Sequence, residues 1–156
     1  MQNSSAKIRI WDLPTRLFHA AFPLCVIGAI VTVKAGAAWM DWHVRLGIAA
    51  LALLLFRVLW GVFGSHYARF CQFVTSPTNT LRYLRKLREE KHQTYQHAGH
   101  NPLGAWAVLA MLFIIGFQAV TGLFANDDIL TQGPLAQFVS EAMSSRLTGW
   151  HQWNEP

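Results

Sequence analysis

Cysteine and charged residues are both scarce in this chain of 156 residues. Its two cysteines, Cys25 and Cys71, lie in an apolar run and in a basic loop, at different expected depths, so we expect no disulfide. No Cys-x-x-Cys-His sequence occurs, which argues against covalently attached c-type haem. Charged residues make up only 13% of the chain, whereas hydrophobic residues make up 53%. This balance excludes an ordinary soluble domain and favours a membrane protein.

The charge pattern and the first residues argue against nucleic-acid binding and against a cleavable signal peptide. The net charge of +5 does not indicate nucleic-acid binding, because the cations cluster beside the apolar runs, as membrane topology requires. We expect no cleavable signal peptide, because Pro14 and Arg16 interrupt the first apolar stretch and no clear small-residue cleavage site follows it.

Three apolar runs are long enough to cross a lipid bilayer. A helix needs about 20 apolar residues to span a hydrocarbon core of about 30 Å. The sequence predicts spans at about 18–39, 43–63 and 103–124, a cytoplasmic loop at 65–102 and an unfinished fourth segment at 147–156. These elements predict one domain over residues 1–156, an all-α membrane protein built as an up-and-down transmembrane helical bundle.

The long loop is basic and contains an amphipathic segment. Leucine and tyrosine residues recur among basic residues between Pro77 and Lys91, which predicts a helix on the cytoplasmic membrane surface. Nine Lys and Arg residues lie on the side of the N-terminus and this loop, against three on the opposite side. By the positive-inside rule we expect a multi-pass protein in contact with lipid, with its N-terminus in the cytoplasm.

Three histidines stand at the ends of apolar segments. His19 begins the first run near the cytoplasmic face, whereas His43 begins the second, antiparallel run near the outer face, so these two cannot bind the same metal. His151, in the unfinished segment, lies at the depth of His43, so those two rings could face each other. Two neutral imidazoles from different helices are what a six-coordinate b-type haem requires, because the porphyrin supplies the other four ligands.

Plainer interpretations of the same residues stay open. A histidine in the first turn of a membrane helix is often only an interfacial polar residue. Arg57 lies fourteen residues after His43, about 21 Å along the helix, and could either reach the inner headgroups or turn inward. Glycines in the runs could leave room for a flat macrocycle or simply pack helices together. The histidines of the basic loop are expected to be mostly solvated, because no cysteine or well-spaced acid completes a zinc site there.

Several short motifs resemble a known family. The segment from Trp11 to His19 has the pattern Trp-Asp-x-Pro-x-Arg-x-x-His, which resembles the opening of bacterial b-type cytochromes of the cytochrome b561 and nickel-hydrogenase cytochrome b subunit group. Motifs that continue the resemblance over nearly the whole chain begin at Asp41, Phe56, Gly64, Gly99 and Thr121. The resemblance implies a four-helix bundle of the bacterial inner membrane with two haems b, one near each surface.

The resemblance also implies roles for individual residues. It makes His19 an axial ligand of the inner haem, and His43 and His151 the axial ligands of the outer haem. The family's fourth ligand is a histidine further along the last helix, and this sequence has none there, so we expect one or two haems b and a truncated fourth helix. His100 is expected to replace that ligand or, in preference, to contact a propionate or the surface. Arg57 is expected at a propionate of the inner haem.

The function implied by the resemblance is electron transfer by a subunit rather than stand-alone catalysis. Iron held by two imidazoles has no open position, so it cycles between Fe(III) and Fe(II) without binding a substrate. The implied partners are a quinone and a soluble dehydrogenase, hydrogenase or c-type cytochrome, and a homo-oligomer or hetero-oligomer could supply an absent ligand. The alternative is a truncated, haem-free membrane anchor or interaction subunit.

Overall fold

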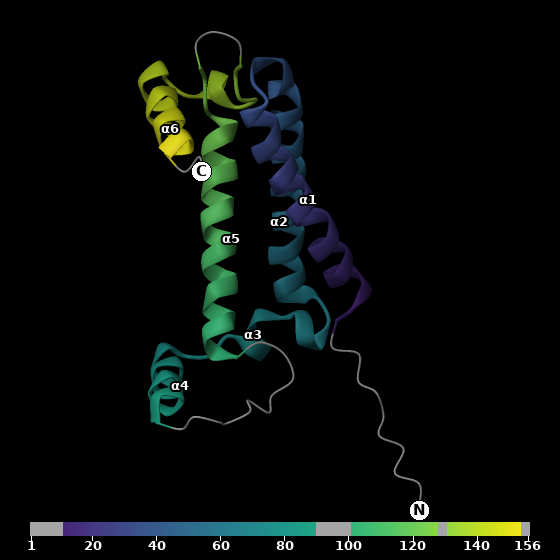
Figure 1. Cartoon of the computed structure of the whole chain (residues 1–156), viewed down its shortest axis with the longest axis vertical. Helices are drawn as coiled ribbons and strands as arrows, with labels where there is room; N and C mark the ends of the chain where they lie inside the picture. The colour runs from purple at the N-terminus through teal and green to yellow at the C-terminus, as the bar shows by residue number, and fades with distance from the viewer. Residues whose placement is uncertain (1–10, 90–100, 128–130, 154–156) are drawn as a thin grey trace, which may run out of the picture.

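The computed structural model describes residues 11–89, 101–127 and 131–153. Within these ranges the chain is helical apart from short connections and one isolated β-bridge. The elements are α1 (Leu13–Lys34), η1 (Ala37–Trp39), α2 (Met40–Phe63), η2 (His66–Ala68), α3 (Phe70–Phe73), α4 (Pro77–Glu89), α5 (Pro102–Leu123), η3 (Ala136–Phe138) and α6 (Glu141–Trp153). Figure 1 shows α1, α2 and α5 as long rods, with α6 beside one end of α5 and α3 and α4 at the other end.

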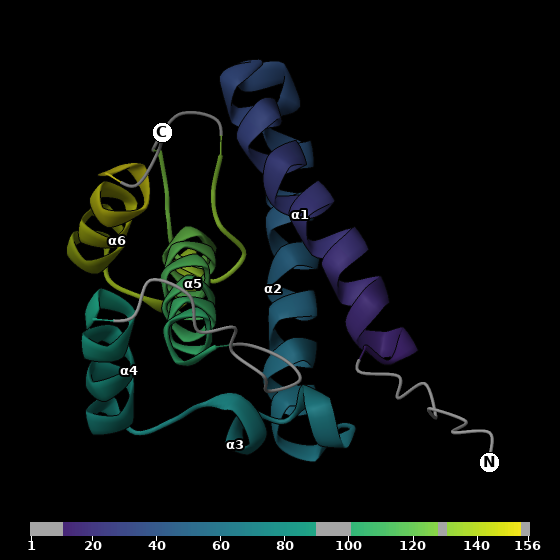
Figure 2. The same cartoon turned by 60° about the horizontal axis from the view of Figure 1, so that its bottom comes forward.

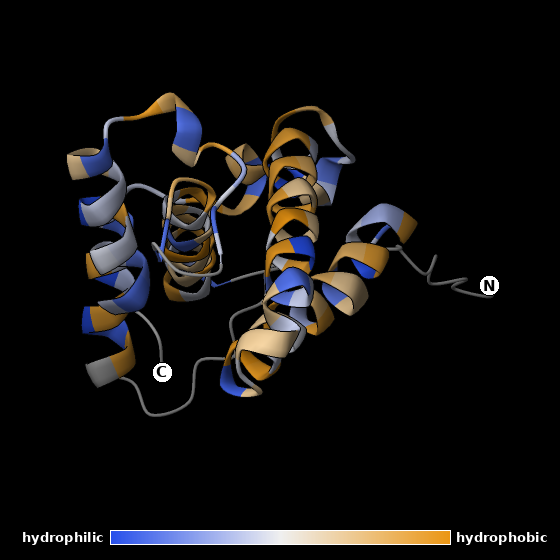
Figure 3. Ribbon diagram, turned by 90° about the horizontal axis from the view of Figure 1, so that it is seen from above, coloured by the Kyte–Doolittle hydropathy of each residue, from blue (hydrophilic) through white to orange (hydrophobic). Residues whose placement is uncertain are grey.

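Three segments are long and apolar enough to cross a membrane, namely Leu13–Lys34, Ala37–Phe63 and Pro102–Leu123. Many of their large apolar side chains point outward: Leu24 is 71% exposed and Phe113 is 73% exposed. Figure 3 shows that hydrophobic residues dominate these helices. Such surfaces are stable only in contact with lipid. The prediction of an all-α, multi-pass membrane bundle is therefore confirmed.

Helix α1 begins and ends earlier than the predicted span of 18–39. The side chain of Asp12 caps its start, because Asp12 Oδ1 accepts a hydrogen bond from the Thr15 N–H at 2.8 Å. Pro14 lies in the first turn, where its fixed φ suits a helix and its missing N–H costs nothing. The end follows from Gly36, whose φ of 96° lies in the left-handed region that favours glycine.

Helix α6 begins at Glu141, six residues before the predicted fourth segment. Ser144 Oγ donates to the Phe124 carbonyl oxygen at 2.8 Å. Thr148 Oγ1 accepts from the Asn126 N–H at 2.9 Å and lies 3.2 Å from the Asn126 carbonyl oxygen. These bonds dock α6 against the end of α5. The first turns of α6 are polar, so apolar periodicity gave no sign of them.

A small core fixes the crossing of α1 and α2. It consists of Phe18, Phe22, Ala50 and Leu54, and partly buried side chains of α5 pack against it. Helix α4 confirms the predicted amphipathic segment, and Figure 2 shows it beside the lower end of α5. The Trp106 Nε1–H donates to Thr80 Oγ1 at 3.2 Å, which ties α4 to α5.

Candidate cofactor site

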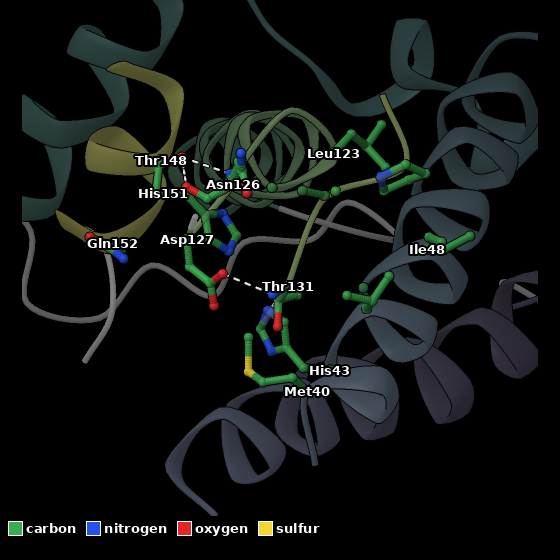
Figure 4. A pocket seen from close by; sticks show the side chains of 17 residues that line it. Met40, His43, Ile48, Leu123, Asn126, Asp127, Thr131, Thr148, His151 and Gln152 are labelled. Atoms are coloured by element: carbon green, nitrogen blue, oxygen red, sulfur yellow. Dashed lines mark hydrogen bonds between the residues drawn. The ribbon is translucent and has the colours of Figure 1, made fainter. Parts of the chain in front are cut away.

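Two imidazole rings face each other near one end of the bundle. His43 comes from the first turn of α2 and His151 from the last turn of α6. Their ring centroids lie 6.0 Å apart and their planes make an angle of 74°. Figure 4 shows both side chains lining one pocket, His43 from α2 and His151 from α6. The structure thus brings together the pair that the sequence placed at a common depth.

Hydrogen bonds fix the tautomer of both rings. Nδ1 of His43 lies 2.9 Å from the carbonyl oxygen of Ala29 in α1. Nδ1 of His151 lies 2.9 Å from the carbonyl oxygen of Gln118 in α5. A carbonyl oxygen can only accept, so each Nδ1 carries the hydrogen and each lone pair lies on Nε2. This is the form in which histidine binds a metal, with its other nitrogen oriented by a second group.

Two cavities flank the paired rings and share His43, Gly47, Ala119 and His151 in their walls. The first, of about 120 Å³, also has polar walls formed by Asn126, Asp127, Thr131, Thr148 and Gln152. The second, of about 310 Å³, is lined mainly by apolar side chains of α1 and α5. The space around the rings therefore has one polar end and one apolar end.

This donor set fits haem b. An imidazole nitrogen binds a first-row metal at about 2 Å, so two axial imidazoles on one iron place their ring centres about 6 Å apart. The observed separation is 6.0 Å. A haem has an apolar edge and an opposite edge with two carboxylates, which matches the two ends of the space. Among the described residues no group of three or more His, Cys, Asp or Glu could hold a bare metal ion, whereas a porphyrin needs only two side chains.

His19 belongs to a different cavity. Its Nδ1 lies 2.7 Å from the Thr15 carbonyl oxygen, so it has the same tautomer as the other two histidines. Its ring stacks on Trp11, with centroids 4.8 Å apart and planes 25° apart. It lines a cavity of about 350 Å³ between α1, α2 and α5, here called the inner cavity. The inner cavity does not include His43 or His151 in its walls.

Arg57 also lines the inner cavity and turns inward rather than outward. Its side chain is 5% exposed. Its Nη1 donates to the Ala68 carbonyl oxygen at 3.3 Å, and its guanidinium lies 4.8 Å from the centre of the Phe70 ring. Of the two interpretations of this arginine, the geometry favours the inward one. His100 lies outside the described residues, so its role stays a prediction.

The carboxylate of Asp12 joins the start of α1 to the end of α2 through hydrogen bonds. Besides its bond to Thr15, Asp12 accepts hydrogen bonds from the Trp60 Nε1–H at 2.9 Å and from the Ser65 hydroxyl. Burial by itself raises the pKa of the Asp12 carboxyl, but these hydrogen bonds outweigh burial and lower its pKa to about 2. The carboxylate is therefore charged at neutral pH, and it is an electrostatic partner of Arg57.

Residue patterns did not single out every group at these sites. Gln118 interrupts the apolar run of α5, and that interruption was a usable signal, because its side-chain Nε2–H donates to the His151 carbonyl oxygen at 2.8 Å. Thr15 and Tyr67 of the inner cavity gave no such signal in the sequence, because an interfacial threonine or tyrosine is ordinary in a membrane protein.

A membrane-embedded helical bundle with an imidazole pair of this spacing has the features of a haem-binding membrane protein. The family model described as prokaryotic cytochrome b561 matches residues 10–154. The chain belongs to this family, whose members are b-type cytochromes that transfer electrons in membranes. No curated protein and no solved structure matches the chain.

Proposed function

We propose that this protein carries electrons through the membrane by way of a haem b held between His43 and His151. The observation that carries the proposal is their ring separation of 6.0 Å together with the shared Nδ1–H tautomer. When bound, the haem supplies a one-electron Fe(III)/Fe(II) couple. The alternative of a haem-free anchor does not explain why two imidazoles of the same tautomer lie with their centroids 6.0 Å apart.

The protein's own groups bind and orient the haem. The carbonyl oxygens of Ala29 and Gln118 hold the two rings and increase the basicity of the ligand nitrogens. Apolar walls from α1 and α5 exclude water, which tunes the reduction potential. The polar residues at the other end suit the carboxylate edge. With His43 and His151 both holding the iron, the haem would have no open position, so substrate chemistry at the iron is not expected.

We assign a second haem b to the inner cavity, with His19 as an axial ligand and Arg57 at a propionate. The support is that both line one cavity of about 350 Å³, and that the lone pair of His19 lies on Nε2. Two haems at opposite ends of the bundle would let electrons cross from one surface to the other. His100 stays a candidate for an inner-haem contact.

The wider assignment follows the family and the charge distribution. We propose a bacterial inner-membrane location with a cytoplasmic N-terminus, because Lys and Arg gather on the side of the first residues and of α4. The electron partners proposed are a quinone on one side and a soluble dehydrogenase, a hydrogenase or a c-type cytochrome on the other. An oligomer with a second copy or another subunit is compatible with this role.

Haem content of the purified protein tests the proposal. A reduced-minus-oxidised spectrum should show a sharp b-type α band, and the pyridine haemochrome should give one or two haems per chain. Expression with a haem precursor in the medium ensures that supply does not limit loading. A folded, helical preparation that stays colourless would instead support the haem-free anchor.

A further inference from the structure

The carbonyl oxygen that orients His43 also accepts a hydrogen bond from a threonine. Thr32 Oγ1 lies 2.9 Å from the carbonyl oxygen of Ala29, which accepts the Nδ1–H of His43 at 2.9 Å. The same hydroxyl lies 2.8 Å from the carbonyl oxygen of Gly28, so its one hydrogen is shared between two acceptors. Thr32 is buried. The Ala29 oxygen therefore accepts from a ring N–H and from a hydroxyl at once.

The same arrangement recurs at His151, on a different helix. Thr121 Oγ1 lies 2.9 Å from the carbonyl oxygen of Gln118, which accepts the Nδ1–H of His151 at 2.9 Å. The hydroxyl also lies 3.0 Å from the carbonyl oxygen of Phe117 and 3.5 Å from Nδ1 of the ring. Thr121 is only 2% exposed. Each of the paired rings thus faces an oxygen that a buried threonine hydroxyl also contacts.

The position of these threonines is more specific than their bonding. A threonine in a helix commonly donates to a carbonyl oxygen three or four residues earlier, so either bond alone is ordinary. The three spanning segments contain only three threonines, Thr15, Thr32 and Thr121. Two of the three contact the carbonyl oxygens that accept from the paired rings. This coincidence on two separate helices indicates a role at the rings themselves.

A second donor weakens the hydrogen bond between a carbonyl oxygen and an imidazole N–H. The oxygen shares its electron density between two hydrogens, so it attracts the ring proton less strongly. A ring whose Nδ1–H is held less strongly carries less negative charge, and its Nε2 is a weaker electron donor to a metal. Ferric iron depends on that donation more than ferrous iron does, so a weaker donor raises the reduction potential.

We propose that Thr32 and Thr121 are positioning residues that raise the reduction potential of the haem by acting through the carbonyl oxygens that face the two rings. This inference rests on the proposed function, because it requires a haem between those rings. Each threonine acts on a different ring and shares no partner with the other, so their contributions should add.

Redox titration of the whole, haem-loaded protein tests the proposal. The signal of interest is the component of the α band that His43→Ala removes. Valine keeps the shape of threonine and lacks the hydroxyl. At the wild-type midpoint potential, Thr32→Val and Thr121→Val should each increase the ratio of ferric to ferrous haem about twofold or more, and the double variant should multiply the two effects. A more apolar surrounding alone would favour the ferrous form, so the sign of the change separates the two causes.

Serine variants and a distant threonine are the controls. Thr32→Ser and Thr121→Ser keep the hydroxyl and should keep the wild-type midpoint. Thr80→Val removes a buried hydroxyl beside the other end of α5 and should also keep it. In electron paramagnetic resonance the spread of g values should narrow in the valine variants, because the rings become stronger donors.

The possible results separate this inference from the proposed function. A midpoint that is unchanged or raised in either folded valine variant, with haem bound, overturns the role of the threonines alone. Thr32→Ala and Thr121→Ala remove the same hydroxyls and decide the matter where a valine variant does not fold. Protein that binds no haem between the paired rings overturns this inference together with the proposed function.

Discussion

The imidazole ring of His151 packs directly on the backbone of Gly122 in α5. A Cβ added at Gly122 would stand 2.7 Å from Cε1 and 3.1 Å from Nδ1 of that ring. Real Cβ atoms do not approach so closely, so any side chain here must push the ring away. The backbone at Gly122 therefore positions the ring of His151, the candidate haem ligand.

Gly122→Ala should weaken haem binding between His43 and His151, here called the outer site. Displacing a packed side chain costs about 1–3 kcal/mol, so we expect haem affinity to fall about tenfold or more. The measurement is the haem-to-protein ratio of the purified variant, together with the reduced spectrum. Gly116→Ala on the same helix is the control, because its Cβ would lie 3.7 Å from Leu54, an ordinary contact. Equal haem loss in both variants would contradict a specific role for Gly122.

Gly47→Ala should have different effects on the haem-free and the haem-bound protein. Nothing lies within 4 Å of a Cβ added at Gly47, although Gly47 lines both cavities beside the paired rings. In the haem-free form the change should be neutral or stabilising by about 0.5–1 kcal/mol, because alanine is the better helix former. With haem present, the methyl group should lower affinity. Thermal melts of both forms by circular dichroism make the comparison, and a variant that binds haem as wild type does would show that the macrocycle lies elsewhere.

Ser144→Ala should loosen α6 and with it the outer site. The Ser144 hydroxyl is buried and donates to the Phe124 carbonyl oxygen at 2.8 Å. Its loss should destabilise the docking of α6 by about 1 kcal/mol and raise the rate of haem dissociation. Ser145→Ala is a matched control, since Ser145 is exposed on the next position of the helix. Transfer of haem to apomyoglobin gives the rate, and identical rates for the two variants would argue against this anchoring.

Asp12→Asn should reduce the stability of the α1–α2 junction in a pH-dependent way. Asn keeps the shape but presents a donor toward Trp60 and Ser65, so we expect a loss of about 1–3 kcal/mol at neutral pH. The pKa of Asp12 is lowered from 3.8 to about 2, so its contribution is complete above pH 3.8 and is lost as the pH falls toward 2. Thermal unfolding in detergent between pH 7 and pH 2 measures this. The exposed Asp41→Asn should have a smaller effect. If the difference in stability between wild type and Asp12→Asn increased on acidification, this role of the Asp12 carboxylate would be contradicted.

Much of this architecture could be predicted from local patterns. The three spans follow from apolar length, and the common depth of His43 and His151 follows from alternating topology. The early start of α6 could not be predicted, because its docking bonds join polar residues to the distant end of α5. The Asp12 junction depends on partners 48 and 53 residues away, and His43 is oriented by a backbone carbonyl of another helix. Such contacts leave no periodic trace in a sequence.

The ligand field of the iron tests the central claim most directly. Electron paramagnetic resonance of the oxidised wild-type protein should show a low-spin ferric signal typical of two imidazole ligands. His43→Ala and His151→Ala should each remove the same signal, because either change breaks one axial bond of one haem. His66→Ala, which changes an exposed histidine in η2, should keep it. If the signal survives in His43→Ala or in His151→Ala, these two residues do not hold one iron between them.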